Sequence, residues 1–389
     1  FRRDGSLMWE REVGIDKSLG GDISVPLVDD LNDDGQKEII VANTRGNIWG
    51  YETTMPLFSY NSDGSLLWES YIPRYFRPDG TLFDLDRDGV KELIIFGQYG
   101  TFNQSGDPVA KVMVLNSRTG AIISSWDLHD VLDFFVFPNL PFSPIIGNFD
   151  NDSYYEIAIV YFNENYFEPN WYELNQVTIR IFNLDGTQLW SYELPGAYIG
   201  PPSVGDVNLD GKQELIITTF DNGISSYGRE THALSVFGNS GNLLFQLFPN
   251  CDILTQPSLG DINVANQGLE ILVGVRWCRG GEFSKGMYAI GSQGDILTEF
   301  IGEFFPYYPA IISTLVEGAE KVIITTDTSF ASGVPFQNLY AWDQQGRIMD
   351  RFPKYGESWT FPVVVQDLDN NGVIDIISSS AWDSYIDDL

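Results

Sequence analysis

The polar and apolar positions of the chain follow one pattern that repeats along its whole length. Short aliphatic runs such as EIIVA (38–42), ELIIF (92–96) and ELIIT (214–218) each come directly after an acidic loop. Runs of this length, rich in β-branched residues and bounded by turn residues, are typical of strands. No convincing helical period is present, so the pattern predicts an all-β chain.

The acidic loops mark internal repeats. Complete copies begin at Asp30, Asp84, Asn148, Asp206 and Asp367, and degraded copies begin at Asp261 and Ser313. A proline lies four residues before the loop in five copies, including both degraded ones, as expected for the first residue of a strand. The chain therefore contains seven related units.

A second periodic feature lies between the acidic loops. Segments such as RRDGSLMW and NLDGTQLW place a glycine turn between apolar residues and predict a β-hairpin. Four short antiparallel strands in each repeat are the signature of a propeller blade, and an all-β solenoid is the alternative. We therefore predict one domain, residues 1–389, folded as a seven-bladed β-propeller of four-stranded antiparallel blades. The predicted blades are 22–72, 76–128, 142–194, 200–248, 255–300, 308–352 and 361–389, the last closed by an N-terminal hairpin at 1–12.

Composition and charge exclude several functions. The formal charge is −32, from 54 acidic and 22 basic side chains, and so acidic a surface repels nucleic acid and anionic membranes. It also repels itself unless cations are bound. No run of 18 apolar residues is present, so membrane insertion is not expected. The start, FRRDGSLMWE, has no apolar signal core, and we expect a mature or excised piece of a larger protein.

The acidic loop has the oxygen spacing of a calcium site. Positions 1, 3 and 5 aim side-chain oxygens at one point, glycine at position 6 permits a sharp turn, and the carbonyl of position 7 and the acid of position 9 complete the set. An EF-hand instead carries its bidentate glutamate at position 12 between helices. The alternative is a polar turn without metal, but five copies at fixed spacing favour the metal.

We predict about five Ca²⁺ sites, whose affinity would contribute to folding because the clustered acids repel one another. The ligand positions are Asp30, Asn32, Asp34, Gln36 and Glu38; Asp84, Asp86, Asp88, Val90 and Glu92; Asn148, Asp150, Asp152, Tyr154 and Glu156; Asp206, Asn208, Asp210, Lys212 and Glu214; and Asp367, Asp369, Asn371, Val373 and Asp375. The third loop is weaker because Ser153 replaces the glycine. The two degraded loops are expected to bind no metal.

These loops resemble the calcium loops of the FG-GAP and VCBS repeat family, which includes the integrin-α propeller. The residues that carry the resemblance are Asp30, Asn32, Asp34, Gly35 and Glu38, with the matching sets in 84–92, 206–214 and 367–375. The resemblance implies a seven-bladed propeller in a secreted or cell-surface protein. Most members bind or scaffold and do not catalyse.

Aromatic residues gather in the long loops that a propeller would carry on the face opposite the acidic loops. We predict a recognition surface there for a glycan or an extracellular protein; the alternative is that these rings pack the loops down and cap the central channel. The candidate binding residues are Tyr75, Phe76, Phe135, Trp171, Tyr307, Tyr308 and Trp359. The strand tryptophans Trp9, Trp68 and Trp190 are assigned instead to packing between blades.

Cys251 and Cys278 are the only cysteines. A hairpin that pairs Asp261 with Glu270 would set Cys251 opposite Gly280 and Cys278 opposite Ile253. The two cysteines are then near neighbours and form either a disulfide or a pair of free buried thiols.

The sequence identifies no catalytic residue. It has no nucleophile elbow, zinc-ligand spacing or phosphate loop, and metal binding already accounts for the paired acids. The enzymatic alternative is a polysaccharide lyase on a calcium-loaded propeller, with Arg74, Arg77, His129 and His232 as candidate groups. A purely structural domain of a larger surface protein is the third interpretation.

Overall fold

The computed structural model is built of antiparallel β-sheets, and its described residues include no helix. The structure describes residues 5–11, 26–42, 54–73, 80–99, 109–128, 143–150, 152–163, 176–195, 197–198, 200–220, 233–247, 251–253, 255–262, 268–278, 286–301, 308–314, 320–329, 336–357, 363–367 and 373–377. They contain no helix of the length and apolar character that a membrane crossing needs. The chain forms two compact units, Phe1–Glu193 and Leu194–Leu389, and the all-β prediction is confirmed.

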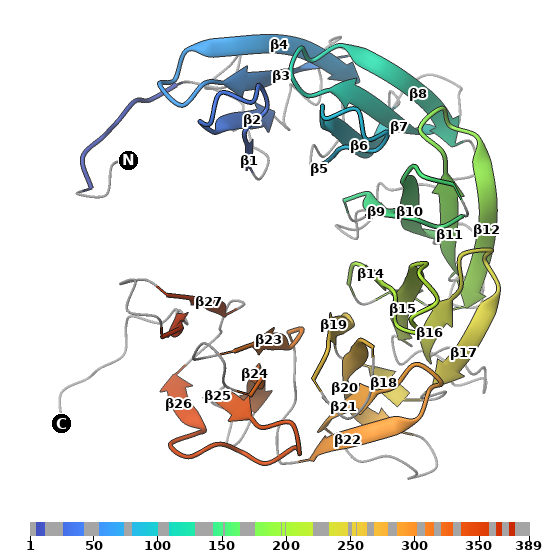
Figure 1. The fold of residues 1–389 in the computed structure, drawn as a ribbon, viewed down its shortest axis with the longest axis vertical. Helices are drawn as coiled ribbons and strands as arrows, with labels where there is room; N and C mark the ends of the chain where they lie inside the picture. Colours follow the sequence, from blue (N-terminus) through green and yellow to red (C-terminus); the bar gives the residue numbers. More distant parts are fainter. Residues whose placement is uncertain are drawn as a thin grey trace, which may run out of the picture. The chain divides into compact units, whose positions relative to one another are not determined.

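The first unit contains three four-stranded sheets, each running in chain order (Figure 1). The strands of the first sheet are β1 (Leu27–Asp29), β2 (Glu38–Ala42), β3 (Thr54–Tyr60) and β4 (Leu66–Pro73). The second sheet has β5 (Thr81–Phe83), β6 (Glu92–Tyr99), β7 (Val109–Asn116) and β8 (Ile122–Leu128). The third has β9 (Ile145–Gly147), β10 (Glu156–Asn163), β11 (Gln176–Phe182) and β12 (Gln188–Pro195). β1, β5 and β9 lie along one side of this unit and β4, β8 and β12 along the other (Figure 1).

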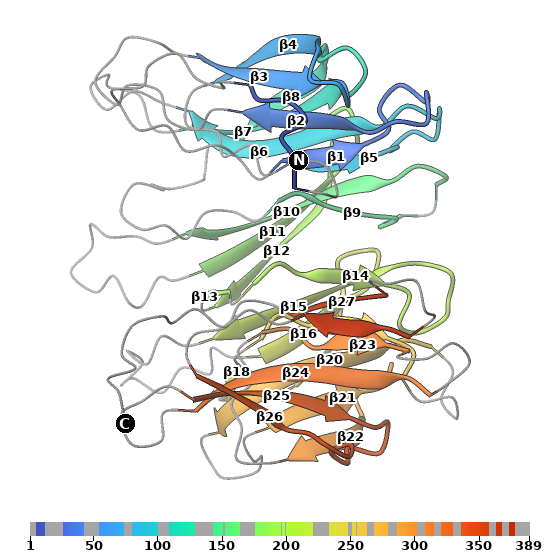
Figure 2. The same ribbon diagram turned by 90° about the vertical axis from the view of Figure 1, so that its left-hand side faces the viewer.

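The second unit continues the pattern in four sheets (Figure 2). The fourth sheet has β13 (Ala197–Tyr198), β14 (Ser203–Gly205), β15 (Glu214–Phe220), β16 (Ala233–Phe237) and β17 (Leu243–Leu247). The fifth has β18 (Cys251–Ile253), β19 (Ser258–Gly260), β20 (Glu270–Cys278), β21 (Gly286–Ile290) and β22 (Ile296–Ile301). The sixth has β23 (Ile311–Ser313), β24 (Val322–Ser329), β25 (Phe336–Trp342) and β26 (Lys354–Glu357). The seventh has β27 (Val364–Gln366) and β28 (Asp375–Ile377) within the described residues.

The apolar core lies between consecutive sheets. One buried cluster joins Ile40 and Leu57 of the first sheet to Leu93 and Met113 of the second. Equivalent clusters join the second sheet to the third, the fourth to the fifth and the fifth to the sixth. The strand that follows each acidic loop is thus buried on both faces of its sheet. This explains why it is aliphatic at successive positions and not only at alternate ones.

A ring from the last strand of one sheet lies on the turn glycine of the next. Trp68 of β4 donates its indole Nε1 to Ser117 O at 2.7 Å. Its ring lies so close to Gly120 that a Cβ there would be 2.6 Å away, and Gly120 has a φ of +69°. Phe245 of β17 lies in the same way on the turn glycine of the fifth sheet, Gly294. The assignment of Trp68 to packing between sheets is therefore confirmed.

The same contact is made by Trp126, which the sequence pattern missed. Trp126 lies on Gly186, yet it follows its own turn glycine by six residues, whereas Trp68 follows by four. Ser124 occupies the position equivalent to Trp68, and its hydroxyl donates to Leu184 O at 2.6 Å. Trp126 is two residues farther along β8 and so lies on the same face of the sheet.

The N-terminal segment repeats this contact without forming a strand. Trp9 donates its Nε1 to Ser62 O at 2.8 Å, and its ring lies over Gly64. Arg11 donates to Gly64 O at 2.8 Å. The hairpin predicted at 1–12 is not present in residues 5–11, which contain no strand; the contacts with the first sheet are instead made by the side chains of Trp9 and Arg11.

Candidate metal centre: the acidic loops

The acidic loops join the first and second strands of their sheets, where the register holds both ends together. In the first sheet Asp29 pairs with Glu38, and in the second Phe83 pairs with Glu92. The glycine at position 6 is left-handed in three loops, with φ of +82°, +88° and +85° at Gly35, Gly89 and Gly211. An L side chain rarely adopts this conformation, which accounts for the glycine.

The glutamate of position 9 holds its loop closed from within. Glu92 is 2 % exposed, and its Oε2 accepts a hydrogen bond from Leu85 N at 2.8 Å. The four equivalent bonds run from the backbone N–H groups of Leu31, Phe149, Val207 and Ile262 to Glu38, Glu156, Glu214 and Glu270. Glu270 keeps this bond in a degraded loop. The first role of the position 9 acid is therefore to support the backbone, which leaves its second oxygen for another partner.

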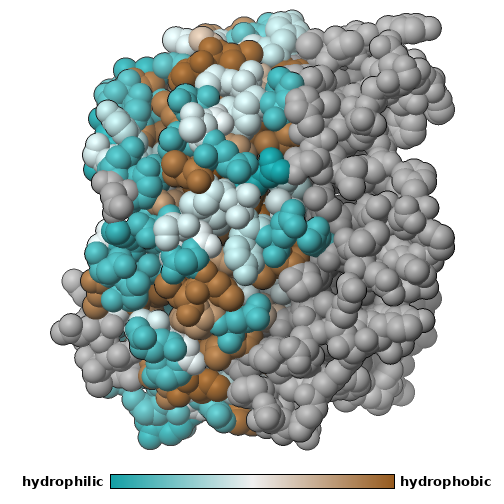
Figure 3. All heavy atoms as spheres, turned by 90° about the vertical axis from the view of Figure 1, so that its right-hand side faces the viewer, coloured by the Kyte–Doolittle hydropathy of each residue, from teal (hydrophilic) through white to brown (hydrophobic). Residues whose placement is uncertain are grey.

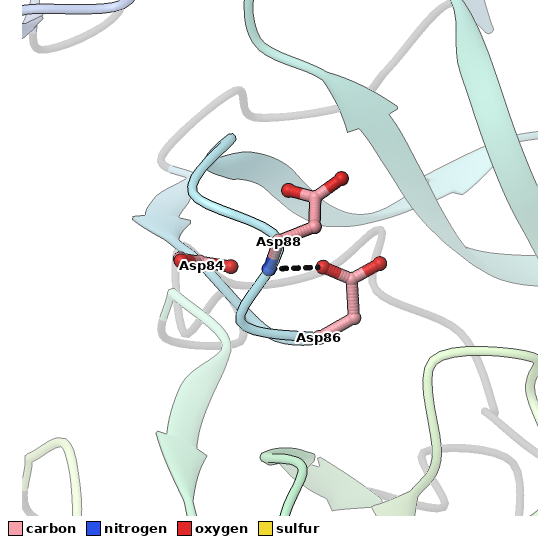
Figure 4. A group of neighbouring side chains, drawn as sticks. All are labelled: Asp84, Asp86 and Asp88. Carbon is pink, nitrogen blue, oxygen red and sulfur yellow. Dashed lines mark hydrogen bonds between the residues drawn. The ribbon is translucent and has the colours of Figure 1, made fainter.

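The loop of the second sheet brings three carboxylates together. One oxygen each of Asp84, Asp86 and Asp88 lies within 4.8 Å of the other two. Asp88 N donates to Asp86 Oδ1 at 3.1 Å (Figure 4). Gly89 N donates to Asp84 Oδ2 at 3.1 Å. The other oxygen of Asp84, Oδ1, is buried and has no hydrogen-bond partner among the described residues. A buried carboxylate oxygen in that state is costly unless a cation binds it.

A second cluster of three acids lies in the loop of the third sheet. Oxygens of Asp150, Asp152 and Glu156 lie within 4.8 Å of one another. Asn148, the predicted ligand at position 1, donates its Nδ2 to Asp152 O at 3.5 Å. This loop therefore places its position 9 acid beside the acids of positions 3 and 5.

The loops that begin at Asp30 and Asp206 have an amide at position 3. In the first, Asp30 Oδ2 accepts from Gly35 N at 2.9 Å. In the other, Asn208 donates its Nδ2 to Asp210 Oδ2 at 3.2 Å and to Glu214 Oε1 at 3.1 Å. Each of these loops therefore has three carboxylates at its ligand positions, as the loop of the third sheet does, and one fewer than the loop of the second sheet.

Only part of the last acidic loop lies within the described residues. Asp367, Val373 and Asp375 are described, and Asp375 pairs with Gln366 across β27 and β28. The other two predicted ligands, Asp369 and Asn371, lie outside the described residues.

Burial and neighbouring acids make three of the glutamates weak acids. Burial raises the pKa of Glu92 to about 7, the nearby aspartates add to the rise, and the hydrogen bond from Leu85 opposes it. The pKa values of Glu156 and Glu214 are raised to about 7 for the same reasons. Without a cation, each of these loops therefore holds a carboxyl group that takes up a proton near neutral pH.

Basic side chains connect the first acidic loop and the degraded loop of the fifth sheet to the sheet that follows each. Arg118, in the turn of the second sheet, donates to Leu31 O at 3.1 Å and forms an ion pair with Asp33 in the first loop. Lys91 pairs with Asp29. In the degraded loop, Asp261 lies 3.8 Å from the Nζ of Lys321. Part of the negative charge is thus balanced by the chain itself.

The predicted ligand face falls almost wholly outside the described residues. Of the aromatic candidates, Tyr75, Phe76, Phe135, Trp171, Tyr307 and Trp359 lie outside them, as do Arg74, Arg77, His129 and His232. Tyr308 is described and is half-buried at the start of the sixth sheet. The binding face and the lyase groups remain predictions.

Exposed aliphatic side chains form a second surface feature. They follow the turn glycines at the start of the last strands: Leu66 is 51 %, Ile122 52 % and Leu244 41 % exposed. Brown apolar patches lie among teal polar ones on the surface in Figure 3. The sequence signal for these positions is a pair of apolar residues two and three places after most of the turn glycines, a pattern that by itself predicts hairpin strands.

The cysteines lie at one end of the fifth sheet. Cys251 of β18 pairs directly with Cys278 of β20, and Ile253 pairs with Val275 after an irregularity. The expected register is wrong: Gly260, not Asp261, pairs with Glu270. This shift by one, together with the irregularity, brings the cysteines opposite each other.

No family model matches the chain, and no curated protein matches it. Among solved structures it is similar to the V. cholerae biofilm matrix protein Bap1, with 13 % identity over 97 % of this chain and 88 % of that one, at a TM-score of 0.37. The likeness to BBS1N in complex with ARL6DN has 10 % identity over 90 % of each chain, at 0.46. The likeness to the Pyrococcus horikoshii acylaminoacyl peptidase has 14 % identity over 88 % of this chain and 47 % of that one, at 0.41.

Proposed function

We propose that the chain is a calcium-stabilised, seven-bladed β-propeller that acts outside the cell as a non-enzymatic binding or adhesion protein. The observation that carries the calcium proposal is the buried Oδ1 of Asp84. This oxygen has no hydrogen-bond partner in the part of the chain that the structure describes, and Asp84 belongs to a cluster of three carboxylates. Closure of the seven sheets into a ring is part of the proposal. What supports it is Trp9, which lies on Gly64 as Trp68 lies on Gly120.

The donor set of the second loop fits Ca²⁺. Asp84, Asp86, Asp88 and Glu92, with the carbonyl of Val90, offer the oxygen ligands that this cation prefers. Each carboxylate has several lone pairs and can hold a backbone N–H and a cation together. Bound Ca²⁺ would supply the charge that offsets the repulsion among the acids.

Calcium binding measured by isothermal titration should give about five ions per chain, one for each complete loop. The double variant D84N/D86N is expected to bind one ion fewer, because amides lack the charge that gathers the cation. Asp261→Asn, in a degraded loop, is the matched control and should leave the number unchanged. Failure of the wild type to bind Ca²⁺ at millimolar concentration would refute the proposal.

The partner that we propose is a glycan or an extracellular protein, bound by the aromatic loops of the opposite face. Its support is the sequence: many rings beside polar residues on loops that a rigid sheet scaffold holds in place. A glycan array should give selective binding, and Trp171→Ala with Trp359→Ala should abolish it. The same preparation should release no unsaturated, ultraviolet-absorbing product from acidic polysaccharides; such a product would instead establish the lyase alternative.

A further inference from the structure

The fifth sheet combines a degraded acidic loop at one end of β20 with a cysteine-bearing short strand at the other end. At one end, the loop from Asp261 to Glu270 keeps its first and last acids but has no acid between them. At the other end, β18 adds a short strand beside β20, joined to it by the pairs Cys251–Cys278 and Ile253–Val275. The fourth sheet has a similar short strand, β13, but its pairs are Ala197–Phe220 and Tyr198–Thr219.

The backbone register puts the two cysteines within the reach of a disulfide. Residues directly opposite in an antiparallel pair have Cα atoms about 4.5–5.5 Å apart, and disulfides span Cα distances of about 4.4–6.8 Å. The chain has two cysteines in total, so neither has another partner in the same molecule.

We propose that Cys251 and Cys278 form a cross-strand disulfide that links β18 to β20 and stabilises the fifth sheet. β18 is joined to β20 by two backbone pairs, and a covalent bond between the two strands adds a constraint that these pairs do not supply. The covalent bond lies at the end of β20 opposite the degraded loop. The inference does not rest on calcium binding and stands or falls separately from it.

The bond forms by exchange with a disulfide of low molecular weight, such as oxidised glutathione. The thiolate of one cysteine attacks the reagent, releases one reduced thiol and leaves a mixed disulfide. The thiolate of the other cysteine then displaces the second reduced thiol. Two cysteine thiols are oxidised to one disulfide, and one disulfide reagent is reduced to two thiols.

Thiol counting tests the bond itself. Full-length protein equilibrated with oxidised and reduced glutathione, then unfolded without reductant, should show no free thiol, and two after reduction. Peptide mapping should find the two cysteine peptides joined and lighter by two hydrogen atoms. Cys251→Ser is the control and should show one reactive thiol per chain. Two free thiols in the wild type, glutathione adducts, or a disulfide-linked dimer would each overturn the proposal.

Thermal unfolding tests the stabilising role. Reduction should lower the melting temperature of the wild type by roughly 4 °C, because the bond closes a loop of 26 intervening residues. The same drop is expected in calcium and in chelator, since the two constraints act at separate places. The double variant C251S/C278S should not respond to reductant. An unchanged wild-type melting temperature after complete reduction would refute the stabilising role, whatever the chelator does.

Discussion

Replacing Trp68 by alanine is expected to lower the free energy of unfolding by about 3–5 kcal/mol. The side chain is 7 % exposed and belongs to the core between the first and second sheets. Its removal also leaves Ser117 O, a buried acceptor, without the indole that now donates to it. Urea unfolding at constant calcium concentration, followed by circular dichroism, measures the loss.

Two variants on the same strand separate packing from other causes. Leu66→Ala changes an exposed side chain and should cost less than about 0.5 kcal/mol. Trp68→Phe keeps a ring on Gly120 but cannot donate to Ser117 O, so its cost should fall between those of the other two variants. If Trp68→Ala were no more destabilising than Leu66→Ala, the ring would not be the contact that joins these sheets.

The stability of the metal-free protein is expected to fall as the pH rises from about 5 to 8. In the folded protein the pKa values of Glu92, Glu156 and Glu214 are raised from 4.5 to about 7. The folded state therefore holds these protons more tightly than the unfolded state. The resulting stability is fully present below about pH 4.5 and is lost as the pH rises through 7, on the order of 1–3 kcal/mol for each glutamate.

Calcium should reverse the sign of this slope. The cation competes with the proton for the same carboxylates, so its binding strengthens as the pH rises. Melting temperatures in chelator and in 5–10 mM calcium should therefore diverge with increasing pH. This calcium concentration exceeds what the expected sites, about five per chain, can bind. Glu92→Gln is the control, because an amide does not titrate, and its slope in chelator should be smaller by about a third. Parallel curves would contradict the assignment of these glutamates to cation sites.

The repeats and the place of the acidic loops were predictable from the sequence because both depend on local patterns. Glu92 and Glu214 stand directly before aliphatic residues that form a buried strand. Their own burial could therefore be expected from the neighbouring sequence. The hydrogen bond that each glutamate accepts from the backbone N–H of loop position 2 could not be predicted from the sequence. The acids at alternate positions suggested metal ligation alone. Glu270 separates the two roles, since it keeps the bond where the loop has degraded.

Features that depend on the register between strands were harder to predict. The pairing of Cys251 with Cys278 arises from an irregularity in β18 that no residue pattern announces. Trp126 was missed because its ring is two residues beyond the position that Trp68 occupies in its own strand. The N-terminal segment has the apolar pattern of a hairpin, but residues 5–11 hold the first sheet by side chains.

The turn glycines also bear on how such a chain can evolve. The rings of Trp68, Trp126 and Phe245 each lie on the turn glycine of the repeat that follows. An unequal crossover that inserted one more repeat would bring a matching ring and a matching glycine with it, and both new joints would be made at once. Repeat number can therefore change by whole units, whereas a mutation of a single turn glycine damages one joint and leaves the rest intact.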